Sequence, residues 1–118
     1  MTTNLPARPD RDCGECPRLR TFLLDNREKY PTWHNAPVDS FGDLNGEILI
    51  VGLAPGLKGA NRTGRPFTGD YAGDLLYDTL LKYSLAQGEY KAEPDDGLRL
   101  NNCRITNAVR CLPPENKP

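Results

Sequence analysis

The stretch from Glu47 to Asp70 constrains the fold more than any other part of the chain. It opens with a short apolar run that ends at Gly52 and Pro55, which is typical of a strand buried on both faces in a parallel sheet. A loop follows in which glycines alternate with polar and cationic side chains. In an open α/β sheet, ligands bind beyond the carboxyl ends of the strands. We therefore expect this loop to line a binding crevice, with a Gly-rich turn that binds nothing as the alternative.

The segments around this loop predict two helices and a second strand. Apolar residues recur on one face from Pro17, and Pro31 ends that helix. The spacing over residues 71–85 predicts a second helix, which begins at about Asp70. Residues 98–111 return to the sheet as one strand. A parallel pair of strands needs cover on both faces, so these elements predict only part of an α/β domain.

Length and composition fit one ordinary domain, with residues 1–12 as a loose tail and 13–118 as the folded part. The chain has 118 residues, of which 37% are hydrophobic and 26% charged. No window approaches the roughly 18 apolar residues that cross a bilayer, so we expect a cytoplasmic protein without membrane contact. The net charge of −1 gives no global attraction to nucleic acid. DNA binding would have to come from the loop cations Lys58, Arg62 and Arg65.

Four cysteines in a reducing compartment favour metal ligation over disulfides. Cys13 and Cys16 form a C-x-x-C pair at the expected start of a helix, where the partial positive charge favours thiolate. If one strand joins Cys103 to Cys111, its ends lie roughly 26 Å apart, which is too far for one site. Cys103 and Cys111 therefore cannot both serve one site unless the chain folds back sharply. A zinc ion held by all four cysteines is the alternative, and it requires the strand prediction to be wrong.

Residues 52–70 read Gly-Leu-Ala-Pro-Gly-Leu-Lys-Gly-Ala-Asn-Arg-Thr-Gly-Arg-Pro-Phe-Thr-Gly-Asp. This string resembles the first active-site motif of the family 5 (type B) uracil-DNA glycosylases. The segments at 41–43 and 104–111 are similar to the same family, whereas Gly56-Leu57-Lys58 departs from the Ala-Ala-His of many members. The resemblance implies an α/β fold, a three-layer α/β/α sandwich around a parallel sheet, of which this chain is the N-terminal half.

The resemblance also implies a function, the hydrolysis of the N-glycosidic bond of uracil in DNA after the base has flipped into a pocket. Phe67 would stack on the base, and Asn107 would read its edge or orient water. Asp70 would orient water or cap the helix. The pocket would be shaped through backbone contacts by Gly52, Ala54, Gly56 and Asn61.

Ala54 stands where many members of the superfamily carry an acidic or amide residue, which leaves Asn107 and Asp70 as the expected catalytic residues. A small side chain at Ala54 would also admit larger deaminated bases such as hypoxanthine. The family's second motif, which contains a histidine, belongs to the other half. We therefore expect the chain alone to be inactive.

The resemblance further implies a [4Fe–4S] cluster. Its ligands here would be Cys13, Cys16 and Cys111, with the fourth cysteine beyond residue 118. Cys103 would then be a packed or free thiol. The expected partner is DNA containing uracil or another deaminated base, bound by a monomer. Two alternatives stay open, a type A (family 4) iron-sulfur glycosylase and a non-enzymatic module in which zinc staples a nucleic-acid-binding loop. A nucleotide-phosphate site is disfavoured because no G-x-x-x-x-G-K-[ST] string occurs.

Overall fold

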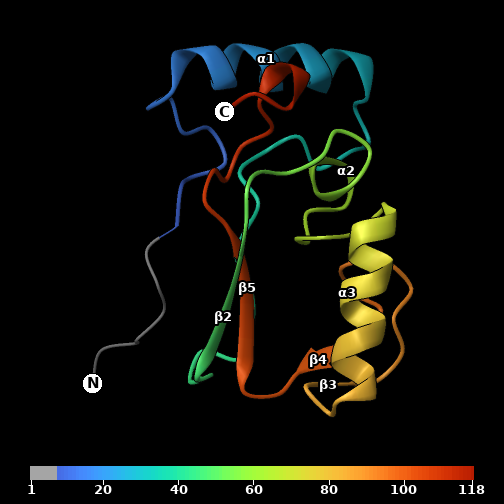
Figure 1. Cartoon of the computed structure of the whole chain (residues 1–118). Coiled ribbons are helices and arrows are strands. Elements are labelled where there is room, and N and C mark those ends of the chain that lie inside the picture. The colour runs from blue at the N-terminus through green and yellow to red at the C-terminus, as the bar shows by residue number, and fades with distance from the viewer. Residues whose placement is uncertain (1–7) are drawn as a thin grey trace.

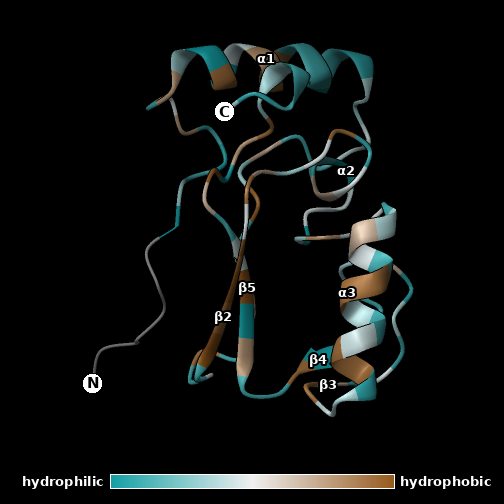
Figure 2. Cartoon of the chain, in the orientation of Figure 1, coloured by the Kyte–Doolittle hydropathy of each residue, from teal (hydrophilic) through white to brown (hydrophobic). Residues whose placement is uncertain are grey.

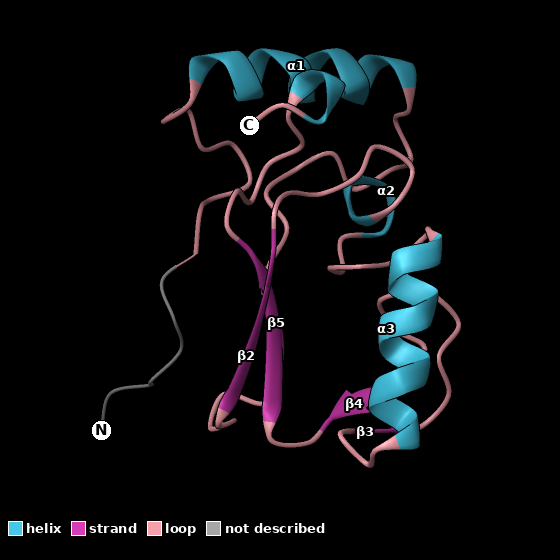
Figure 3. Cartoon of the chain, in the orientation of Figure 1, coloured by secondary structure: helices cyan, strands magenta, loops and turns pink. Residues whose placement is uncertain are grey.

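The computed structural model describes residues 8–118, which form a small mixed α/β structure (Figures 1 and 3). Its elements are α1 (Pro17–Lys29), β1 (Phe41–Gly42), β2 (Ile48–Gly52), α2 (Ala60–Thr63), α3 (Tyr71–Lys82), β3 (Ala86–Gln87), β4 (Arg99–Leu100), β5 (Cys103–Asn107) and the 3-10 turn η1 (Pro114–Asn116). Part of the predicted tail, residues 1–7, lies outside the described residues. Just after it, Arg8 forms an ion pair with Asp39.

The main sheet has the order β1-β5-β2. Strands β2 and β5 are parallel, as predicted, and their register pairs Ile48 with Cys103 at one end and Gly52 with Asn107 at the other. The short strand β1, which the sequence did not reveal, runs antiparallel to β5. Gly52 and Asn107 therefore lie side by side at the carboxyl edge of the sheet, where the long glycine loop begins.

The prediction of one strand over residues 98–111 is wrong at both ends. Asn102 adopts the left-handed conformation with φ of 57°, so the chain turns between β4 and β5. Strand β4 pairs with β3 in a separate two-stranded sheet. Strand β5 ends at Asn107, although backbone N–H groups of the next two residues still donate to Gly52 and Leu53.

The buried core lies between α3 and one face of the main sheet (Figure 1). Tyr77 and Leu80 on α3 pack with Cys103 and Ile105 on β5. The expected helices are confirmed: α1 has Pro17 at its first position and ends two residues before Pro31.

Strand β2 contradicts the prediction of burial on both faces. Leu49 is 61% exposed and Val51 57% exposed, and Leu53 just beyond the strand is 63% exposed. Figure 2 shows this strand as a hydrophobic arrow. Within residues 8–118, β2 pairs only with β5 and is an edge strand, and Ile50 alone of its long side chains packs against the core. No helix in the described part of the chain is long and apolar enough to span a bilayer.

Candidate active site

Within the loop from Gly52 to Asp70, the segment around Gly59 and the segment around Gly69 touch each other backbone to backbone. A Cβ atom on Gly59 would lie 2.5 Å from the carbonyl oxygen of Thr68. Gly69 has φ of 85°, and a Cβ there would lie 2.7 Å from the carbonyl oxygen of Lys58. Both contacts are closer than any side chain permits, so these glycines let α2 and the start of α3 close over the end of β2.

A cavity of about 100 Å³ lies where these two segments of the loop meet the carboxyl edge of the sheet. It is lined by Leu53, Ala54, Pro55, Gly56, Ala60, Phe67, Thr68, Asp70, Ala72 and Asn107. The structure thus brings together five of the predicted site residues, namely Ala54, Gly56, Phe67, Asp70 and Asn107. These residues are separated in the sequence, from position 54 to position 107, and the parallel pairing of β2 with β5 brings them together.

Phe67 and Asn107 approach each other at Gly52. A Cβ on Gly52 would lie 2.6 Å from Oδ1 of Asn107 and 2.6 Å from Cζ of Phe67. Asn107 is only 6% exposed, and its amide has no hydrogen-bond partner within residues 8–118. Because a buried amide is normally satisfied, this group is available to a ligand in the cavity.

Asp70 caps α3, which confirms the second of the two roles expected for it. Its Oδ1 accepts a hydrogen bond of 2.8 Å from the backbone N–H of Gly73. Its Oδ2 lies on the side of Gly56, 4.0 Å from where a Cβ on that residue would sit. One carboxylate oxygen therefore holds the helix, while the other faces the cavity wall.

The three cations expected on the loop divide into two kinds. Lys58 and Arg62 are exposed and form no ion pair in the part of the chain that the structure describes. Arg65 corrects the prediction of DNA binding, because its side chain is 3% exposed and its two terminal nitrogens donate to Asp96 at 2.7 and 2.8 Å. Its acidic partner lies 31 residues away, so no local pattern revealed the pair.

The side chain of Asn61 does not line the cavity, and the expectation for this residue concerns backbone contacts only. It is fully buried and donates to Oδ1 of Asn35 at 2.9 Å. Its backbone N–H donates to the carbonyl of Gly56 at 3.0 Å. Asn61 therefore acts on the cavity only through the backbone of the loop.

Cys103 and the other three cysteines lie in different places. Cys16 is the N-cap of α1. Burial raises the pKa of the Cys111 thiol, and the neighbouring thiols of Cys13 and Cys16 add to the rise. Cys103 is fully buried and donates to the carbonyl of Leu85, as expected for a packed thiol. Within residues 8–118, no three His, Cys, Asp or Glu side chains are grouped closely enough to hold a metal. The thiols thus have the chemistry for a cluster, whereas their placement does not form a complete site.

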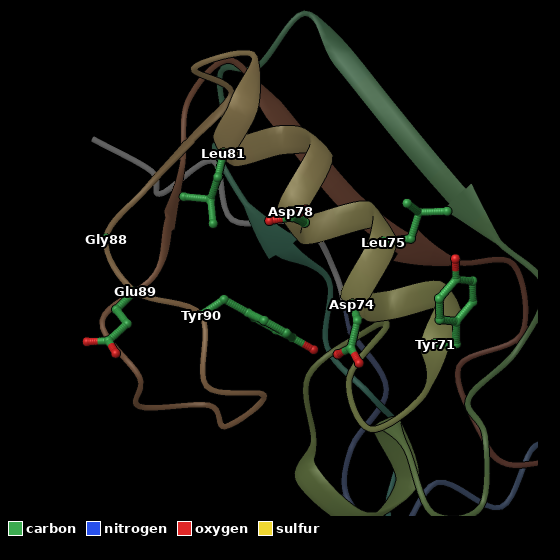
Figure 4. A pocket seen from close by; sticks show the side chains of 8 residues that line it. All are labelled: Tyr71, Asp74, Leu75, Asp78, Leu81, Gly88, Glu89 and Tyr90. Atoms are coloured by element: carbon green, nitrogen blue, oxygen red, sulfur yellow. The ribbon is translucent and has the colours of Figure 1, made fainter.

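A larger hollow of the surface lies elsewhere, between α3 and the segment at 88–90 (Figure 4). Its volume is about 590 Å³. Asp74, Asp78 and Glu89 line it together with Tyr71 and Tyr90. These carboxylates repel phosphate, and none of the predicted site residues is in this wall. We therefore place the candidate site at the smaller cavity.

Known proteins match this chain along most of its length. Residues 40–118 match the profile described as "UDG: Uracil DNA glycosylase superfamily". The "Type-5 uracil-DNA glycosylase" of Thermus thermophilus is 46% identical over 112 residues, 90% of this chain and 50% of the relative. The type-5 protein of Pyrobaculum aerophilum is 40% identical over 111 residues, 91% of this chain and 49% of the relative.

A more distant relative is the "Type-4 uracil-DNA glycosylase" of Pyrobaculum aerophilum, 33% identical over 97 residues, 80% of this chain and 42% of the relative. The chain therefore spans about half the length of the curated relatives it matches. The loop at 52–70 and strand β5, which build the cavity, both fall inside the matched region. The chain belongs to the uracil DNA glycosylase superfamily.

Proposed function

We propose that the full-length protein is a DNA-repair glycosylase that hydrolyses the N-glycosidic bond of uracil. One observation carries the proposal: the unpartnered amide of Asn107 and the ring of Phe67 meet over Gly52, in a cavity at the carboxyl edge of a parallel sheet. The names of the type-5 relatives support the same activity. The type-4 alternative is less well supported, because those relatives are less similar.

The residues of the cavity suit the chemistry of base removal. The base has to leave the stack before its glycosidic bond is accessible, and the face of Phe67 would hold it there. The amide of Asn107 both donates and accepts, so it can pair with the alternating N–H and C=O groups of a uracil edge or orient the attacking water. Ala54 provides no group for proton transfer. The free Oδ2 of Asp70 would therefore stabilise the cationic sugar or align water.

The cavity also bears on which base is removed. Its volume of about 100 Å³ leaves less room for the two fused rings of hypoxanthine than for the single ring of uracil. We propose uracil as the primary substrate. Hypoxanthine would require the wall at Ala54 to open. Parallel assays on uracil- and hypoxanthine-containing duplexes decide this point, and release of uracil alone would rule the larger base out.

DNA would meet the protein at the loop that carries Lys58 and Arg62. Both side chains are exposed, and in the sequence they flank the buried residues Gly59 to Asn61. Cationic side chains of this kind bind phosphates without reading sequence. We also propose that the protein acts as a monomer, because all the residues that line the cavity come from one copy of the chain.

We further propose that Cys13, Cys16 and Cys111 are three ligands of a [4Fe–4S] cluster, with zinc as the alternative metal. The proposal is supported by the neighbouring thiols of Cys13 and Cys16, which add to the raised pKa of Cys111, and by the separate burial of Cys103. When bound, such a cluster would join the start of α1 to the segment after β5. Iron and sulfide contents of the purified protein test this. Cys111→Ser should lower both, and Cys103→Ser should leave both unchanged.

The exposed apolar side chains of β2 support the three-layer α/β/α sandwich in the full-length protein. Leu49 and Val51 would then contact a layer that the described residues do not contain. In that arrangement β2 would become an interior strand, which is the setting in which continuous apolar runs occur.

The deciding experiment measures uracil release from a duplex by this chain and by a version extended to the length of its relatives. We expect the extended protein to act and its Asn107→Ala variant to lose about 100-fold or more in rate while it still binds DNA. Asn45→Ala, an exposed amide remote from the cavity, is the control. If neither protein releases uracil and the chain binds zinc and DNA, the non-enzymatic module replaces this proposal.

A further inference from the structure

Arg65 and Asp96 form a fully buried ion pair two residues from Phe67. Their side chains are 3% and 0% exposed. Each oxygen of Asp96 accepts one N–H of the guanidinium and one backbone N–H, from Leu98 at 3.0 Å and from Lys91 at 2.8 Å. Four donors therefore converge on a single carboxylate, which connects the segment at 91–98 to the glycine loop.

Three aromatic rings surround the guanidinium of Arg65. Its central carbon lies 4.9 Å from the ring centre of Phe41, 5.2 Å from that of Tyr77 and 5.5 Å from that of Tyr90. Burial acts to lower the pKa of Arg65, but the hydrogen bonds and charge of Asp96 raise it overall. Asp96 in turn has its pKa held well below its usual range by Arg65 and the two backbone donors, against the effect of burial. Both groups therefore stay charged in the folded protein.

Phe67, two residues after Arg65 in the glycine loop, is held in a strained backbone conformation. Phe67 has φ of 59°, in the left-handed region that is unfavourable for a residue other than glycine. The carbonyl of Pro66, just before it, accepts a hydrogen bond from the hydroxyl of Tyr77. The carbonyl of Arg65 accepts one from the hydroxyl of Thr68 at 2.9 Å. The residues before and after Phe67 are thus held by hydrogen bonds, which limits the movement of its backbone away from Gly52.

We propose that the buried Arg65–Asp96 pair is a positioning device, which keeps the ring of Phe67 over the cavity for a flipped base. The inference rests on the proposed function and assigns these two residues a role in recognition through Phe67. Arg65 is the rigid link, because its guanidinium is fixed from outside the loop and its carbonyl is fixed from inside it. A planar guanidinium suits this task, since it holds a carboxylate by two parallel bonds.

The test uses two variants of the pair and one matched control. Asp96→Asn removes the charge, and Arg65→Lys keeps the charge but loses the bidentate geometry, so it stays informative if the first variant fails to fold. Asp95→Asn removes the neighbouring exposed carboxylate. Circular dichroism checks that each variant is folded.

Fluorophenylalanine labelling reports on the ring directly, because the chain has only three phenylalanines. Phe22 lies on α1 and serves as the internal reference, Phe41 contacts Arg65, and Phe67 is assigned by its loss in Phe67→Leu. We expect both variants of the pair to shift or broaden the Phe67 resonance in the fluorine NMR spectrum. Asp95→Asn should leave it unchanged. A shift of Phe41 alone would show that the pair only stabilises the core, and the proposal would be wrong.

The second readout is the binding of two oligodeoxynucleotides by the full-length protein and its variants. One oligodeoxynucleotide carries a single 2′-deoxy-2′-fluoroarabinouridine, and the other carries the matching thymidine analogue. The fluorine disfavours a cationic sugar, so bond cleavage does not interfere. We expect the preference for uracil to fall about tenfold in Asp96→Asn and Arg65→Lys and to stay in Asp95→Asn. An unchanged preference in both variants overturns the proposal. If the wild type shows no preference, the proposed function fails, and the Phe67 resonance alone decides whether the pair positions the ring.

Discussion

The amide of Asn107 and the ring of Phe67 occupy the space that a side chain at residue 52 would need. A Cβ on Gly52 would lie 2.6 Å from an atom of each. The two side chains come from strand β5 and from the glycine loop, and only a glycine at the end of β2 lets them meet. This arrangement explains why a strand of β-branched and other large residues ends in glycine at the cavity.

Gly52→Ala is therefore expected to destabilise the protein and to separate the two groups. Overpacking of a closed site costs typically 1–3 kcal/mol, and the free energy of unfolding from urea titration measures it. Gly56→Ala is the matched control in the same loop, since a Cβ there meets nothing closer than 4.0 Å. At a position of ordinary φ, this change stabilises by about 0.4–1 kcal/mol. Equal losses of stability in the two variants would contradict the geometry.

Asp70 offers a way to separate a structural role from a chemical one. Asp70→Asn keeps an oxygen that accepts from Gly73 and should preserve stability, whereas Asp70→Ala should lose about 1 kcal/mol. If the free Oδ2 acts on the substrate, uracil release by the full-length protein falls about 100-fold in both variants. Full activity of Asp70→Asn would instead restrict this residue to capping. Thermal unfolding and single-turnover kinetics provide the two measurements.

The parts of the site that depend on neighbouring residues could be predicted from the sequence. The helix start at Asp70 and the limits of α1 between Pro17 and Pro31 follow from capping and proline signals that act within one turn. The loop between Gly52 and Asp70 was recognised by its glycines and its motif.

The parts that depend on distant partners could not be predicted. Arg65 looked like a surface cation beside Arg62, because its partner Asp96 lies in a polar segment without a pattern of its own. The hydrogen bond from the side chain of Asn61 to Asn35 likewise joins residues that lie 26 positions apart. The end of β5 at Asn107 could not be predicted either, because no residue in 103–111 strongly disfavours a strand. Tertiary partners decided each of these outcomes.

Lys58 and Arg62 are expected to bind phosphates, and salt dependence tests this. Removing a single ionic interaction with a phosphate of duplex DNA makes the slope of log K against log salt shallower by about 0.9. Lys58→Ala and Arg62→Ala should each reduce the slope by this amount and weaken binding to all sequences alike. Lys82→Ala, at the opposite end of α3 from the cavity, should leave it unchanged. Equal slopes in all three variants would place the DNA elsewhere.

Tyr90 predicts a loss of stability at high pH. Burial raises the pKa of its phenol to about 12, and the negative charge of Asp74 adds to the effect while Arg65 opposes it. Figure 4 shows the hydroxyl turned toward Asp74. An unfolded tyrosine has a pKa of about 10, so the folded state favours the neutral phenol. This contribution to stability is fully present below pH of about 10 and is lost as the pH rises to about 12.

Tyr90→Phe should therefore make the free energy of unfolding less dependent on pH between about 10 and 12. The ring of the variant can still stack on Tyr77, which lies 4.7 Å away between ring centres. Tyr77, whose pKa burial also raises, keeps its own share of the pH dependence, so the slope falls without vanishing. Tyr83→Phe, at a 66% exposed ring, is the control and should leave the slope as it is. Urea titrations across this range measure both variants, and an unchanged slope in Tyr90→Phe would show that its phenol ionises as freely in the folded protein as in the unfolded chain.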